Sequence, residues 1–182
     1  MYNPTSSYRN IPTHNDEARE QFRAASRFNA ARLKGEWNQL KARLTGRPRH
    51  LKDLKKEQQG RCVIRSYAAG LRSVAIGDIV GSESRSRDFD RDFNPLNLNL
   101  RDRWRNIASL VAQNTPLPPV ELIQVGETYF VRDGHHRISV AKDVGQKYVD
   151  AEVTVLELTE RQSAHVPGKF AGSNAQLVFA CG

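Results

Sequence analysis

The first third of the chain combines a polar start with one long stretch of helical spacing. Residues 1–12 are polar and contain two prolines, so we expect a loosely held segment there. Apolar residues then recur every three or four positions, which predicts a helix that begins near Thr13 or Asn15 and stops at Gly46. The predicted apolar stripe consists of Leu33, Trp37, Leu40 and Leu44, with Phe22 as an extension. We interpret Trp37 as a core residue.

The next part alternates between short apolar runs and helical spacing. A short basic helix carrying Leu51 and Leu54 is expected before Gly60. The later elements are predicted strands at 62–65 and 74–80, a helix over 101–113, a hairpin over 120–132, a helix from His136 to Gly145, and a strand at 148–155. This order predicts an α+β fold that follows a basic helical extension, and the family resemblance described below implies a small mixed sheet with flanking helices. We divide the chain into a flexible N-terminus (1–12), the basic extension (13–60), the domain (61–160) and a C-terminal tail (161–182).

The positive charge is concentrated near the start of the chain. The net charge is +8, yet residues 1–72 hold 16 Lys and Arg against 6 Asp and Glu, whereas residues 73–182 hold 12 against 14. This asymmetry favours an arm that binds a polyanion such as DNA. The expected nucleic-acid-binding side chains, opposite the apolar stripe, are Arg23, Arg27, Lys34, Lys41 and Arg43. A solvated face on a docking helix is an equal alternative. A third possibility is binding of a protein partner or a second copy (a homo-oligomer) through the Trp37 stripe.

The composition restricts where the protein works. No apolar run approaches the ~20 residues that a membrane helix needs, so we expect no membrane partner. The polar N-terminus does not resemble a secretory signal. Two cysteines, Cys62 and Cys181, are too few for a disulfide scaffold, and a cytoplasmic location is the default expectation.

The segment VRDGHHRISVAKDVG (131–145) joins the predicted hairpin to the next helix. Around one glycine it gathers four polar side chains, Asp133, His135, His136 and Arg137. A helix N-terminus attracts phosphate through its free N–H groups, and Gly134 lets backbone approach the anion closely. Arg137 adds a guanidinium fork, and the histidines add donors or proton carriers. Phosphate binding is therefore the leading interpretation of this turn.

Two other interpretations fit the same turn. Zinc binding is less favoured because neighbouring helical side chains point about 100° apart and no third soft ligand has a recognisable spacing. A purely structural role stays open, in which Asp133 caps the helix and the histidines bind backbone groups.

Several elements in order resemble the ParB/sulfiredoxin-like domain, over about residues 74–156. The matching stretches are Ser84-Arg85 and Phe89-Asp90 in the first loop, the helix Trp104–Val111, the strand start Pro119-Val120-Glu-Leu, and the turn Gly134-His135-His136-Arg137. In ParB partition proteins the last of these turns is Gly-Glu-Arg-Arg and binds nucleotide phosphates. In sulfiredoxins a reactive cysteine stands at the position of His135, so the resemblance does not imply sulfiredoxin activity. The form Asp-Gly-His-His-Arg is similar to the turn of ParB-like kinases that phosphorylate free serine.

This resemblance implies a nucleotide-dependent phosphotransferase or NTP hydrolase. Its ligand would be ATP, ADP or CTP, bound by Arg85, Gly134, His136 and Arg137. Glu83 is the candidate base, with Asp88 in reserve, and His135 and His136 would act on the phosphoryl group. Asp133 is a candidate Mg²⁺ ligand.

The alternative is a DNA-binding protein that uses the basic helices of residues 13–60. In one form of it, Asp133 and the histidines serve metal-dependent cleavage of the nucleic acid, as in a nuclease.

Overall fold

The computed structural model describes residues 14–46 and 48–160. Its elements are α1 (His14–Thr45), β1 (Lys52–Asp53), α2 (Leu54–Glu57), β2 (Arg61–Ala75), η1 (Ile76–Asp78), β3 (Ile79–Ser82), η2 (Leu98–Leu100), α3 (Arg101–Ala112), β4 (Val120–Val125), β5 (Thr128–Asp133), α4 (His135–Asp143) and β6 (Tyr148–Glu160). The mixed α+β architecture predicted from the sequence is confirmed. The segments predicted as a flexible N-terminus (1–12) and a C-terminal tail (161–182) lie outside the described residues.

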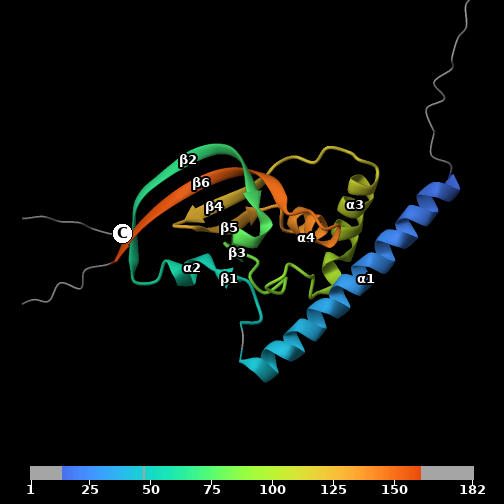
Figure 1. The fold of residues 1–182 in the computed structure, drawn as a ribbon, viewed down its shortest axis with the longest axis horizontal. Helices are drawn as coiled ribbons and strands as arrows, with labels where there is room; N and C mark the ends of the chain where they lie inside the picture. Colours follow the sequence, from blue (N-terminus) through green and yellow to red (C-terminus); the bar gives the residue numbers. More distant parts are fainter. Residues whose placement is uncertain (1–13, 47, 161–182) are drawn as a thin grey trace, which may run out of the picture.

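One mixed sheet of six strands organises the fold, in the order β1-β3-β5-β4-β6-β2 (Figure 1). β4 and β5 form the predicted hairpin, whereas β3 and β6 join it in parallel. β2 is longer than the strand expected at 62–65, because it pairs antiparallel with β6 from Arg61 opposite Glu160 to Ala75 opposite Tyr148. The second expected strand, 74–80, is divided between the end of β2, a 3-10 turn and β3.

The main core lies between one face of the sheet and the three longer helices. Trp104 of α3 is fully buried there and meets the ring of Phe28 of α1 edge-on at 5.8 Å. Its indole Nε1 donates to Ser139 Oγ of α4 over 2.9 Å, which ties α3 to α4. The opposite face of the sheet has a smaller cluster formed by Leu54, Ile123 and Phe130. Because Phe28 belongs to the main core, α1 packs as an integral part of the fold.

The orientation of α1 differs from the sequence prediction. The helix buries Ala24, Phe28 and Ala31, together with Gly35, against the body. The predicted core residue Trp37 is instead 62% exposed, and the rest of its stripe, Leu33, Leu40 and Leu44, is exposed as well. The reason is close packing by small residues: a Cβ added at Gly35 would lie 3.1 Å from Leu96 Cδ2.

The described helices give no sign of a membrane span, since none of them is both long enough and apolar enough to cross a bilayer.

Candidate functional site

The predicted strand-to-helix turn is present, and glycine is required in it. β5 ends at Asp133, Gly134 has φ of +100°, and α4 begins at His135. A Cβ at residue 134 would lie 2.5 Å from Val120 Cγ1, so both the backbone angle and the space exclude a side chain. The first amide bonded within the helix is that of Ile138, which donates to the Gly134 carbonyl over 3.0 Å. The N–H groups of residues 135–137 precede that bond and form the anion-attracting end of α4.

His135 is held by a serine that sequence reasoning missed. Ser82, fully buried at the end of β3, accepts from the backbone N–H of Arg85 at 2.8 Å and of Ser84 at 3.2 Å. Both acceptor positions of its hydroxyl are thus used, and its own proton must go to His135 Nε2, 2.7 Å away. His135 Nε2 is therefore the acceptor, and the neutral ring carries its proton on Nδ1. Ser82 has no signal in the sequence beyond its place at the end of a strand.

Both histidines are buried and stay neutral at physiological pH. Burial is the largest cause that lowers the pKa of His135 to about 4, with help from the charge of Arg85. Burial followed by the charge of Arg103 lowers the pKa of His136 to about 4. The Phe89 ring stacks on His135 at 5.9 Å and meets His136 edge-on at 5.6 Å. His136 Nδ1 is buried and has no hydrogen-bond partner among the described residues.

A small pocket of about 60 Å³ lies at this turn. Its lining is the first turn of α4 with Asp133 and Gly134, Ile107, and three arginines, Arg85, Arg103 and Arg132. The volume is far below the ~300 Å³ or more of a pocket that encloses a whole small molecule, so it suits a compact anionic group. Arg103 was not predicted. The signal that could have found it is its place beside the buried Trp104, on the helix that packs against α4.

Arg137 is bound to the protein itself. Its Nη1 donates to the carbonyls of Pro118 and Pro119, both at 2.6 Å, and its Nη2 pairs with Asp133 Oδ2 at 2.5 Å. These contacts use both terminal nitrogens, so in this structure Arg137 fixes the loop before β4 and the phosphate contact predicted for it stays a prediction. The Asp133 carboxylate bonds to Arg137 and caps no amide among the described residues. The structural alternative of an Asp133 cap is therefore not observed.

The two candidate bases, Glu83 and Asp88, lie outside the pocket lining. Glu83, just after β3, pairs with Arg132 through Oε2 and Nε at 3.3 Å. Asp88 accepts from Asn97 Nδ2 at 3.2 Å. Within residues 14–46 and 48–160, no group of three His, Cys, Asp or Glu side chains could hold a metal ion. A Mg²⁺ ion at Asp133 would thus depend on oxygens that a ligand supplies, and it would compete with Arg137 for the carboxylate.

The basic residues predicted on α1 do not belong to this turn. Arg27 pairs with Asp143 of α4 at 2.5 Å, and its guanidinium lies 6.0 Å from the centroid of the Trp104 ring. It therefore holds α1 to the body. The remaining four, Arg23, Lys34, Lys41 and Arg43, are exposed along the helix. They flank the apolar stripe, because the face opposite to it is buried.

Comparison with known proteins shows a distant structural likeness. No protein-family model matches the chain, and no curated protein matches it. Among solved structures, sulfiredoxin from Arabidopsis thaliana is similar at a TM-score of 0.33 and 17% sequence identity, over 46% of this chain and 82% of that chain.

Proposed function

We propose that the β5–α4 turn binds the phosphate groups of a nucleotide, ATP, ADP or CTP, and supports phosphoryl transfer or hydrolysis. The observation that carries this proposal is the pocket at the start of α4, where Arg85, Arg103 and Arg132 surround bare helix amides. Charge on a phosphate would be neutralised by guanidinium groups and by the partial positive charge of the helix end. The base and sugar would lie outside this small pocket, over its exposed arginine rim.

The histidines have separate roles in this proposal. His135 is hydrogen-bonded to Ser82 and forms part of the pocket wall. His136, which lines the pocket and has a neutral ring, would donate a hydrogen bond to a phosphoryl oxygen. Glu83 would accept the proton of the attacking hydroxyl or water after release from Arg132. Arg137 would act as a positioning residue that keeps the glycine turn open.

The test is a calorimetric titration with ATP, ADP and CTP, each with and without Mg²⁺. Arg103→Ala should weaken binding of the preferred nucleotide by roughly tenfold or more, because a charge-assisted hydrogen bond to phosphate is lost. Arg101→Ala is the matched control, since Arg101 is an exposed arginine on the same helix outside the pocket lining. Equal affinities of the two variants, or no heat with any nucleotide from folded wild type, would contradict the proposal.

A second candidate function is DNA binding by the exposed basic residues of α1. It is favoured by one observation, that Arg23, Lys34, Lys41 and Arg43 remain exposed while Arg27 is used internally. In fluorescence anisotropy with duplex DNA, Lys34→Gln with Lys41→Gln should lower the affinity and reduce the salt slope by about 2. Arg103→Ala should leave DNA binding unchanged, and an unchanged salt slope in the lysine variant would reject this function.

Nuclease activity is the catalytic form of this second candidate. Plasmid nicking with Mg²⁺ or Mn²⁺ that is equal for wild type and His136→Ala would assign the cleavage to a contaminant.

A further inference from the structure

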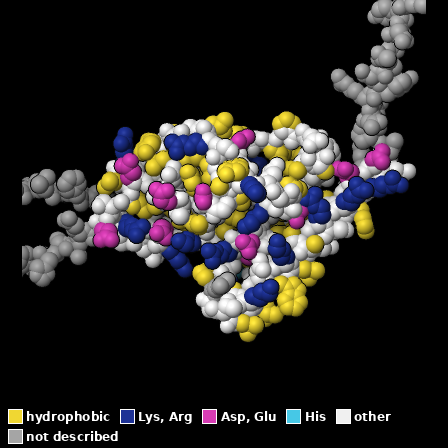
Figure 2. All heavy atoms as spheres, in the orientation of Figure 1, with side chains coloured by type: hydrophobic (Ala, Val, Ile, Leu, Met, Phe, Trp, Pro, Cys, Tyr) yellow, Lys and Arg dark blue, Asp and Glu magenta, His cyan; other side chains and the backbone are white. Residues whose placement is uncertain are grey.

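The exposed side of α1 carries a row of large apolar side chains. Leu33 is 51% exposed, Trp37 62%, Leu40 47% and Leu44 81%. Figure 2 shows the hydrophobic side chains gathered at the C-terminal end of α1. Phe22, 74% exposed, continues the row about three helical turns toward the N-terminus. We call Leu33, Trp37, Leu40 and Leu44 the Trp37 row.

Within residues 14–46 and 48–160, the body of the protein does not cover the Trp37 row. At about 100° per residue, the row lies roughly opposite the face that carries Phe28, Ala31 and Gly35, which is buried against the body. Contacts by α1 with the body therefore leave the row free for another molecule.

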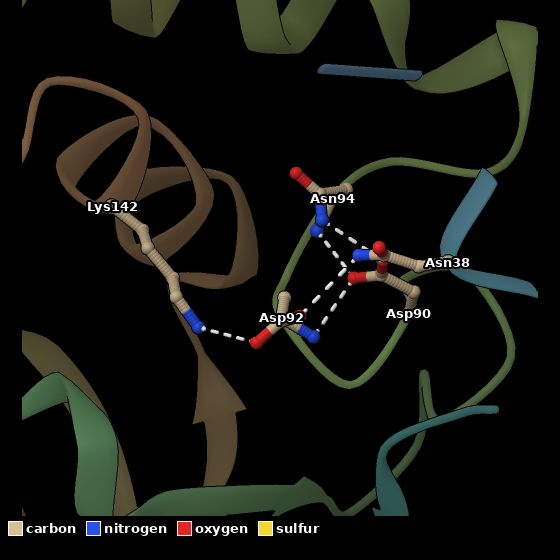
Figure 3. A network of polar contacts seen from close by, with 5 residues as sticks. All are labelled: Asn38, Asp90, Asp92, Asn94 and Lys142. Atoms are coloured by element: carbon tan, nitrogen blue, oxygen red, sulfur yellow. Dashed lines mark hydrogen bonds and ion pairs between the residues drawn. The ribbon is translucent and has the colours of Figure 1, made fainter. Parts of the chain in front are cut away.

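A polar network fixes this rotation of α1 (Figure 3). Asn38 Nδ2 donates to Asp90 Oδ2 at 2.9 Å and to Asp92 Oδ2 at 3.3 Å. Asp90 is 1% exposed and also accepts the backbone and side-chain N–H groups of Asn94. Asp92 in turn accepts from Lys142 Nζ of α4 at 3.1 Å. Because this network bonds α1 on the side of Asn38, the helix cannot turn the Trp37 row inward without breaking the hydrogen bonds of Asn38, one of which is to the buried Asp90.

We propose that the Trp37 row is the interface for a second copy of this chain, in a parallel pair of α1 helices. The row has spacings of four, three and four residues, the repeat that lets two helices pack along a shared seam. Glu36 and Lys41 flank the seam on opposite sides. Their separation of five residues is the spacing at which side chains of two parallel helices pair across a seam. Each two-fold-related pair would thus form two Glu36–Lys41 contacts.

The flanking charges favour the parallel arrangement over the antiparallel one. An antiparallel pair would bring Lys34 close to Lys41 of the second copy, twice, which places like charges together. The parallel pair avoids this contact. Glu36 already pairs with Arg32 in its own helix at 2.6 Å, and a carboxylate has acceptor sites for both partners.

The test is sedimentation velocity of the full chain over a concentration series. Trp37→Glu should raise the dimer dissociation constant at least tenfold, with an unchanged circular dichroism spectrum. Ile64→Glu is the control, because Ile64 is also exposed, at 64%, and lies on the edge strand β2 away from α1. It should leave the dimer intact.

The charge pair supplies a second, independent readout. Glu36→Lys and Lys41→Glu should each weaken the dimer, and the double exchange should restore it. The proposal is overturned if wild type is monomeric at high micromolar concentration, or if Ile64→Glu and not Trp37→Glu dissociates the dimer. Suppose that Trp37→Glu disrupts the dimer but the double exchange of Glu36 and Lys41 does not restore the affinity lost in the two single exchanges. That result would overturn the parallel arrangement.

Discussion

The positions of individual protons determine which hydrogen bonds are made at the turn by Ser82, His135 and His136. Because the Ser82 hydroxyl accepts two backbone N–H groups, it donates to His135 Nε2, and protonation of that nitrogen would remove the bond. Burial also disfavours protonation, because it lowers the pKa of both histidine rings. The histidines and the glycine could be predicted from the local motif. Ser82 and Arg103 were missed because tertiary packing brings them to the turn, and only the place of Arg103 beside Trp104 gave a signal.

The lowered histidine pKa values predict a loss of stability in acid. A histidine whose folded pKa is about 4 binds its proton more readily in the unfolded chain, where the pKa is about 6.5. Its contribution to stability is thus complete above about pH 6.5 and is lost as the pH falls toward 4. In urea titrations at pH 7.5 and 4.5, the free energy of unfolding of wild type should fall between the two pH values by about 2 kcal/mol more than that of His136→Asn. Equal losses would mean that His136 titrates normally.

The helices and strands agree with the sequence prediction where local residue spacing determines them. They differ from the prediction where tertiary packing determines them. The hairpin of β4 and β5, the helices α3 and α4 and the stop at Gly145 are as predicted. α1 has the predicted length but has two faces suited to packing, one with large apolar residues and one with Phe28 among small residues. Spacing alone does not choose between them; the close approach at Gly35 and the buried Asp90 network select the second.

Strand β3 provides a test of packing at the element level. A Cβ at Gly81 would lie 2.3 Å from Phe130 Cδ1 and 2.6 Å from the Lys52 carbonyl, so Gly81→Ala must push neighbouring strands apart. We expect a loss of at least about 1–3 kcal/mol in the free energy of unfolding. Gly77→Ala is the control, because nothing lies within 4 Å of a Cβ there, and it should be close to neutral. Similar melting temperatures for both variants would contradict this packing.

At the scale of the whole molecule, the turn proposed to bind phosphate and the Trp37 row are separate features of one fold. The turn lies where β5 meets α4, and the row lies on the side of α1 that faces away from the body. The charge asymmetry of the sequence marks the first part of the chain as basic. It does not reveal that Phe28 of this part enters the main core, because such a contact joins residues far apart in the chain.

The most direct test of the central claim is to locate the bound nucleotide by amide chemical shifts in a ¹H–¹⁵N NMR titration. With the nucleotide that gives the strongest heat, the amides of His135, His136 and Arg137 should shift together with those around Arg85 and Arg103. The Arg103→Ala variant should reach the same shifts only at roughly tenfold higher ligand concentration. Shifts confined to the exposed basic residues of α1, with the first turn of α4 unchanged, would contradict the account.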